Sequence, residues 1–202
     1  MPQSVSQRYK VLFSLNEKGP FYIPTFIITN NCNSNSFYAV TIGIFNKYIW
    51  ITSRIDYCNS LYVHLPKTTS NRLQRIMRCA ARVVALPRYG ESVTNVCKQL
   101  HWLPIRERAK FKILTLVYKS IHGSTPEYLS ELIIPYNPPR ELRSKSSNLL
   151  CVPKCRVKYG ERAFSHAGPS LWNTLPSSIR NASSLAIFKK KLKTHLFTEA
   201  YC

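Results

Sequence analysis

The sequence contains a single aspartate, Asp56, and its other eight acidic residues are glutamates scattered along 202 residues. No second acidic residue lies within 30 residues of Asp56 on either side. Polymerases and nucleases that use two metal ions need two or three carboxylates converging on ions about 3.5–4 Å apart. The shortage of acids therefore argues against two-metal phosphoryl transfer, and we expect the chain not to be an enzyme of that kind.

Other components of catalytic sites are also scarce. The six glycines are dispersed, and no GxxxxGK[ST] loop of the kind that cradles phosphates occurs. None of the five histidines sits in a recognisable catalytic motif, although a Cys/His nucleophile pair stays open on sequence alone. The sequence thus indicates no catalytic residues and no cofactor.

Cysteine is present, but its pattern does not predict disulfides. The seven cysteines are odd in number and no secretory leader precedes them, so we expect reduced thiols in an intracellular protein, nuclear or cytoplasmic. Cys151 and Cys155 have a spacing that suits a zinc pair, with His166 downstream, but a second pair is missing. We therefore expect two ordinary thiols and no bound metal.

Long apolar runs are lacking as well. The longest candidate, residues 37–52, contains Asn46 and Lys47 and falls short of the roughly 18 uninterrupted apolar residues of a transmembrane helix. We expect no membrane partner.

What the chain has in excess is positive charge. Lys and Arg number 29 against 9 acids, and residues 51–202 hold 25 of these cations and 8 of the acids, a net charge of +17. Charge of this size usually indicates an anionic partner, most often nucleic acid. The alternative is a fragment whose compensating acids belong to another part of a larger protein.

The pattern of residues predicts a mainly α fold, a small helical bundle with one short β-hairpin. Residues 1–50 alternate β-branched and aromatic runs with an Asn/Ser-rich break, so we expect them to be strand-like or weakly ordered. The expected organisation continues with a helical region over 51–135, a linker over 136–147 rich in Pro, Ser and Arg, and a hairpin plus C-terminal helices over 148–202.

Caps and breakers set the expected helix limits. Thr69-Ser70 is a suitable N-cap for a helix over 71–86 that Pro87 stops, and a short helix follows over 93–101. Pro104 and Gly123 bracket the strongest helix, which leaves Arg108, Lys112, Thr115 and Lys119 as its narrow polar strip.

Nearer the C-terminus, the alternation in NLLCVP and KCRVKYG predicts the hairpin. Gly168-Pro169 is expected to break a helix in GERAFSHAGPSLWNTLP. Ser183 or Ser184 caps a last helix with a stripe formed by Leu185, Phe188, Leu192 and Leu196.

Three basic helical stripes are the candidate binding residues. Helical Arg and Lys can contact phosphates along a nucleic-acid backbone, although a charge run more commonly marks a solvated helix face. The candidates are Arg72, Arg75, Arg78 and Arg82 in the first stripe, Arg108, Lys112 and Lys119 in the second, and Lys189, Lys190, Lys191 and Lys193 in the third.

The order of several phrases resembles one family, the region C-terminal to the polymerase core of LINE-type, jockey-like non-LTR retrotransposons. The resemblance covers about Ile51 to Phe197 and is carried by SRIDYCNSL, LQRIMRCAARVV, LHWLPIRERAKFKILTLVYKSIHG, YLSELI, RELRSKSSNLLCVP and YGERAFSHAGPSLWNTLPSSIRNASSLAIFKKKLKTHLF. In that family an endonuclease and a reverse transcriptase lie upstream. The resemblance implies that Asp56 is structural, for instance a helix cap or a salt-bridge partner. Residues 1–50 do not share it.

The resemblance and the charge together predict a non-catalytic fragment of an RNA-directed DNA polymerase that binds RNA or DNA backbone through basic helices. Two alternatives stay open. In one, the helices are an interaction module that packs on a reverse transcriptase core domain. In the other, the chain is a decayed reading frame without function.

Overall fold

The computed structural model describes residues 11–14, 25–28, 52–85, 87, 90–137, 148–157 and 159–202, and the chain divides into two units, Met1–Tyr48 and Ile49–Cys202. In the first unit, β1 (Val11–Ser14) pairs antiparallel with β2 (Thr25–Ile28), and Phe13 lies opposite Phe26. Both strands fall within the segment that the sequence predicts as strand-like or weakly ordered.

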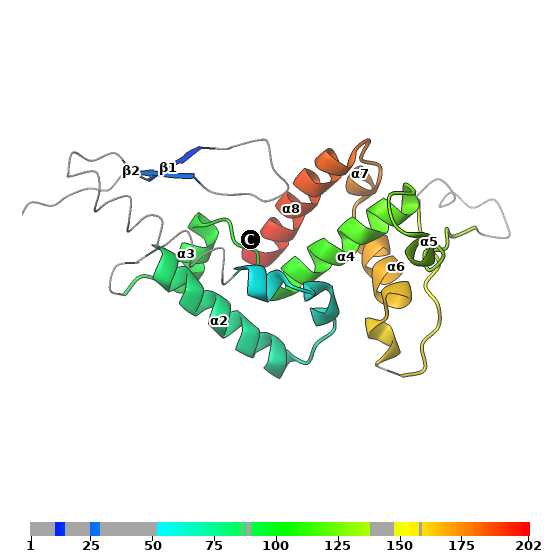
Figure 1. Ribbon diagram of the computed structural model, residues 1–202, viewed down its shortest axis with the longest axis horizontal. Coiled ribbons are helices and arrows are strands. Elements are labelled where there is room, and N and C mark those ends of the chain that lie inside the picture. The colour runs from blue at the N-terminus through cyan, green and yellow to red at the C-terminus, as the bar shows by residue number, and fades with distance from the viewer. Residues whose placement is uncertain are drawn as a thin grey trace, which may run out of the picture. The chain divides into compact units, whose positions relative to one another are not determined.

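The second unit is helical, which confirms the predicted mainly α class (Figure 1). Residues 52–56 form a helical turn that leads into the 3-10 helix η1 (Asn59–Tyr62). The elements that follow are α2 (Lys67–Ala85), α3 (Val93–Gln99), α4 (Ile105–Ile121), α5 (Glu127–Ser130), the 3-10 helix η3 (Gly160–Arg162), α6 (Phe164–Thr174), α7 (Ser177–Arg180) and α8 (Leu185–Tyr201). No helix in the described parts of the chain is both long and apolar enough to span a membrane.

Helix α4 is the centre of this unit and packs against η1, α6 and α8 (Figure 1). Val117 of α4, Trp172 of α6 and Phe188 of α8 are at most 1% exposed and belong to one apolar cluster. The Tyr118 ring stacks on Phe188 with ring centroids 4.4 Å apart, and its hydroxyl donates to the carbonyl of Ala182 at 2.9 Å. The phenol is therefore buried with its polar group satisfied, as a core tyrosine requires.

The predicted limits of α4 and the predicted start of α8 are confirmed, whereas α8 continues to Tyr201, four residues beyond its predicted end. Pro104 directly precedes α4, where its missing N–H costs no hydrogen bond, and Gly123 takes a left-handed φ of +65° after the helix. Ser184 is the N-cap of α8, and its hydroxyl accepts from the Ile187 amide at 3.3 Å. The cap that the sequence left between two serines is therefore Ser184.

The predicted cap of α2 is wrong. The helix begins at Lys67, because Pro66 ends the preceding turn and its carbonyl accepts from the Ser70 amide at 3.0 Å. Ser70 is consequently a buried residue inside the first turns, where its hydroxyl accepts a hydrogen bond from Arg106 Nε at 3.1 Å. Helix α2 ends at Ala85, two residues before Pro87, as predicted.

The predicted break at Gly168-Pro169 is also wrong, because α6 runs through both residues. Gly168 is buried, and a Cβ atom on it would lie 2.9 Å from Val117 Cγ2. The absence of a side chain therefore lets α6 approach α4 closely. Pro169, which cannot donate a helix hydrogen bond, is also fully buried.

The predicted hairpin does not form in the part of 148–160 that the structure describes. Leu150 instead makes an isolated antiparallel bridge with Pro135. Asn173 of α6 holds this segment, because its side chain accepts from the Leu150 amide at 2.9 Å and donates to the Leu150 carbonyl at 2.8 Å. A side chain on a helix thus takes the hydrogen bonds that a hairpin partner would have taken. Most of the predicted linker, residues 138–147, lies outside the described residues.

Candidate nucleic-acid interface

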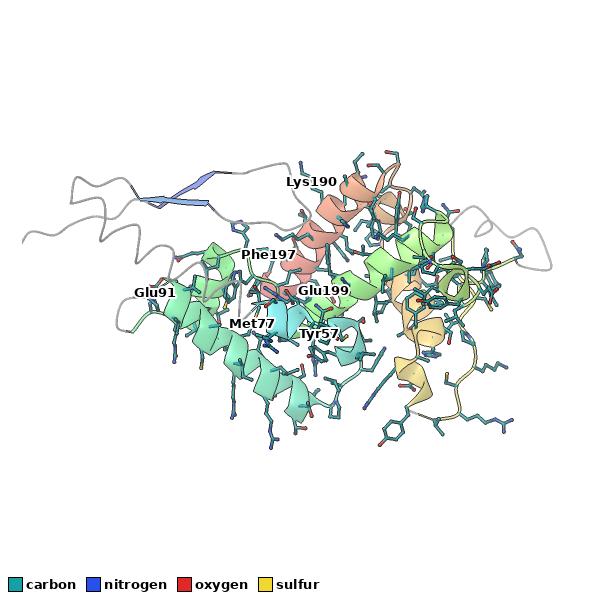
Figure 2. The ribbon with its side chains drawn as sticks, in the orientation of Figure 1. Tyr57, Met77, Glu91, Lys190, Phe197 and Glu199 are labelled. Atoms are coloured by element: carbon teal, nitrogen blue, oxygen red, sulfur yellow. The ribbon has the colours of Figure 1, made fainter. Side chains whose placement is uncertain are left out.

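The four arginines of α2 share one exposed face. Arg72, Arg75, Arg78 and Arg82 are all exposed, and their spacing of three, three and four residues keeps them on the same side of the helix. Figure 2 shows long side chains projecting from α2 away from the neighbouring helices. No Asp or Glu occurs anywhere in Lys67–Ala85, so no acidic residue of the helix itself neutralises this face.

The opposite side of α2 fixes the direction of the arginines. Met77 is 1% exposed and Ala81 is fully buried, and α2 packs against α3 and α4. Rotation of α2 about its axis would expose Met77 or bury guanidinium groups, although the exposed side of the helix also includes the apolar residues Ile76 and Val83. The predicted first stripe is therefore one continuous cationic surface, here called the α2 arginine face (Arg72, Arg75, Arg78, Arg82).

Arg108 is not part of such a surface, and its predicted place in a solvent-facing stripe is wrong. Only 14% of its side chain is exposed, and Nη1 donates to both carboxylate oxygens of Asp56 at 2.7 and 2.8 Å. Nε donates to the Leu103 carbonyl at 3.0 Å, and the guanidinium lies over the Trp102 ring at 5.9 Å. Thr115, predicted on the same strip, is buried and donates to a carbonyl of its own helix.

Lys189 on α8 is close enough to Lys112 and Lys119 on α4 for their positive charges to act on it. Lys189 lies near both α4 lysines, and its pKa is lowered, first by partial burial and then by the charges of Lys119 and Lys112. Mutual repulsion among three ammonium groups is relieved by an anion bound between them. The structure therefore joins members of the second and third predicted stripes into one group, here called the lysine cluster.

The remaining α8 lysines differ from one another. Lys190 is exposed and projects outward in Figure 2. Lys191 is exposed and donates to the Ser178 carbonyl at 3.0 Å. Lys193 is half-buried, and its pKa is lowered by burial and by the charge of Arg108. Lys193 is therefore less accessible to a ligand than Lys190 and Lys191.

An open pocket of about 290 Å³ adjoins the α2 arginine face at Arg78. It is lined by residues of α2, α3, α4 and the C-terminal end of α8, including Lys67 and Arg106. Sequence reasoning missed both residues, because Lys67 was placed before the helix and Arg106 lies outside every stripe. The signal that could have found Lys67 was Pro66, which marks the start of α2.

No three His, Cys, Asp or Glu side chains converge on a common point within the described ranges. Cys151 and Cys155 are both exposed thiols. The described part of the chain thus offers the α2 arginine face and the lysine cluster as cationic surfaces for binding. Its single aspartate, Asp56, is paired with Arg108.

No match was found in a scan against protein-family models, in a search of curated proteins or in a search of solved structures.

Proposed function

We propose that residues 52–202 form a non-catalytic module that binds the phosphate backbone of RNA or DNA through the α2 arginine face. The observation that carries this proposal is the set of four exposed arginines on one face of a helix without acidic residues. Their fork-shaped guanidinium groups match phosphate oxygens in two-point hydrogen bonds. The net charge of +17 over residues 51–202 adds long-range attraction for a polyanion.

The length of the face suits a nucleic-acid strand. Arg72 and Arg82 are ten residues apart, which corresponds to about 15 Å along a helix axis. Phosphates of one strand recur about every 3.4 Å along a duplex axis, so the face spans about four of them. The lysine cluster and Lys190 supply further cations on the same unit.

We further propose that this module is the C-terminal region of a LINE-type, jockey-like retrotransposon polymerase, as its order of sequence phrases suggests. In such a protein it would hold template RNA or target DNA for a catalytic domain encoded upstream. The scarcity of carboxylates supports a binding role, because Asp56 is engaged by Arg108 and no other acidic residue lies within 30 residues of it in the sequence.

A salt titration tests the binding proposal. The full chain is titrated with labelled single-stranded RNA and duplex DNA over a range of salt concentrations. The logarithm of the affinity should fall linearly with the logarithm of salt concentration. The double variant Arg75→Gln/Arg82→Gln should reduce the slope by about 1.8 on duplex DNA and about 1.4 on single strands.

The matched control removes two exposed cations from another part of the unit, as Lys154→Gln/Arg156→Gln. This variant has the same net charge as the α2 double variant but keeps the α2 arginine face. Equal slopes for the two double variants would show that binding follows net charge alone. Absence of binding at low salt would overturn the proposal.

Exposed apolar residues favour a second candidate, a module that packs on a polymerase core domain. Tyr57 is 76% exposed, Leu61 is 71% exposed and Ile76 on α2 is 53% exposed. Such side chains are typical of a surface that a partner covers. Binding of a hydrophobic dye, or self-association that Leu61→Ser/Ile76→Ser abolishes, would support this candidate.

A further inference from the structure

The pocket beside the α2 arginine face has an unusual balance of charge. Its cations are Lys67, Arg78 and Arg106, and Glu107 is the only acidic lining residue in the part of the chain that the structure describes. Lys110 Nζ lies 4.0 Å from the Glu107 carboxylate, but its shorter ion pair is with Glu199 at 2.9 Å. Ser70, Asn71, Gln74 and Thr94 contribute uncharged polar groups to the lining. The pocket thus offers hydrogen-bond donors and a surplus of positive charge to a small anion.

Hydrogen bonds between helices hold the walls of the pocket in place. Arg106 Nε donates to the Ser70 hydroxyl at 3.1 Å. This hydrogen bond to α2 fixes the orientation of the Arg106 guanidinium. Gln74 Oε1 accepts from the Ile105 amide at 2.9 Å and ties the start of α4 to α2. Binding therefore requires little ordering of these side chains, and such preorganisation favours affinity.

Two helices also begin at this pocket. Lys67 is the first residue of α2, which has 19 residues, and Arg106 lies in the first turn of α4, which has 17. The positive ends of both helix dipoles therefore add to the charge of the side chains, whereas the C-terminal end of α8, which also lines the pocket, has the opposite partial charge.

The inner wall contains two ionisable groups that stay neutral. Burial raises the pKa of the Cys97 thiol, and burial chiefly raises the pKa of Tyr201 to about 12. The Tyr201 hydroxyl donates to the Trp102 carbonyl at 2.7 Å. Neither group therefore carries a negative charge at neutral pH that would oppose an anion.

We propose that this pocket binds the terminal phosphate of a nucleic-acid strand that lies along the α2 arginine face, an inference that rests on the proposed function. Arg78 belongs to the α2 arginine face and also lines the pocket, so the end of a strand bound along this face lies next to the pocket. A terminal phosphomonoester carries about −1.5 to −2 at pH 7, whereas an internal diester carries −1. The higher charge matches a lining in which the cations Lys67, Arg78 and Arg106 outnumber the carboxylate of Glu107.

The test compares oligonucleotides of one sequence that end in a 5′-phosphate, a 3′-phosphate or hydroxyl groups only. The full chain should bind one phosphorylated form about tenfold more tightly than the hydroxyl form, as charge-assisted hydrogen bonds allow. If the chain binds all three oligonucleotides with equal affinity, the pocket assignment is overturned and the proposed function is not. Absence of binding to every form would overturn the proposed function with it.

Variants separate the pocket from the face. Lys67→Gln and Arg106→Gln should each remove most of the preference for a phosphorylated end and leave binding of the hydroxyl form nearly unchanged. Arg75→Gln/Arg82→Gln should weaken all three forms and keep their ratio. Arg106→Gln removes a hydrogen bond between helices and can lower the thermal midpoint. Lys67 is exposed, so Lys67→Gln should stay folded and still tests the pocket. A preference that survives both pocket variants would overturn the proposal.

A competition arm distinguishes a strand end from free phosphate. Inorganic phosphate should displace the phosphorylated oligonucleotide only at concentrations far above those of the oligonucleotide itself. If inorganic phosphate or a mononucleotide binds the pocket as tightly as the phosphorylated strand, the pocket is a site for a free ligand and the strand-end assignment is wrong.

Discussion

Asp56 and Arg108 form a two-point ion pair that joins the first helical turn of the second unit to the start of α4. Nη1 of Arg108 donates to both carboxylate oxygens, at 2.7 and 2.8 Å. Asp56 also accepts from Asn59 Nδ2 at 3.3 Å, so the carboxylate holds η1 as well. The interpretation of Asp56 as a structural salt-bridge partner is confirmed.

We predict that Asp56→Asn lowers the free energy of unfolding by about 1–2 kcal/mol. The change leaves a guanidinium that is 14% exposed without its counter-ion, while the 40% exposure of Asp56 limits the loss through solvent screening. Chemical denaturation measures the effect. The exposed Glu131 provides the control, because Glu131→Gln removes the same charge at the surface. Equal stability of the two variants would contradict a structural role for the pair.

Gly168→Ala should destabilise the protein, because the added Cβ would lie 2.9 Å from Val117 Cγ2 and 3.5 Å from Ile133 Cδ1. Overpacking of this kind costs about 1–3 kcal/mol. A double-mutant cycle with Val117→Ala measures how much of the lost free energy of unfolding comes from the contact with Val117. Removing the valine methyl groups should make Gly168→Ala less costly, and an unchanged cost in that background would contradict the proposed clash.

The N-cap of α8 can be tested with two adjacent serines. Ser184→Ala removes the hydroxyl that accepts from the Ile187 amide and should cost about 1 kcal/mol. Ser183→Ala changes an exposed neighbour that is not the cap and should leave the thermal midpoint nearly unchanged. A larger loss from Ser183→Ala would place the cap one residue earlier.

Tyr201 makes stability depend on pH in the alkaline range. Its pKa in the folded protein is about 12, whereas an unfolded tyrosine has a pKa near 10. Folding therefore favours the neutral phenol, and this contribution is complete below about pH 10 and is lost as pH rises toward 12. Subtracting the ultraviolet titration of Tyr201→Phe from that of the native protein isolates this phenol. An ionisation step near pH 10 in the difference would contradict the burial of its hydroxyl.

Elements that depend on neighbouring residues in the chain were predictable from the sequence. Pro104 and Gly123 bracket α4 as expected, since one lacks an N–H and the other tolerates a left-handed φ. In the predicted stripe of α8, Phe188, Leu192 and Leu196 are all at most 1% exposed. Helical periodicity alone identifies such positions, because it determines which side chains share a face.

Elements that depend on distant residues were not predictable. The alternating residues after Asn148 resemble a hairpin, yet Asn173 supplies hydrogen bonds to Leu150 from another helix. Gly168-Pro169 has the composition of a helix breaker, but close packing against Val117 stabilises a continuous α6.

The cationic residues show the same division within the candidate site. The sequence by itself determined that α2 carries four arginines on one side and no acid, because both properties follow from residue order and helical period. Only the tertiary structure decided that Arg75 faces outward whereas Arg108 is held by Asp56. A cationic side chain is available to a ligand only if no acidic residue of the protein already pairs with it. For Arg108 that acidic residue is Asp56, which is 52 residues away in the sequence.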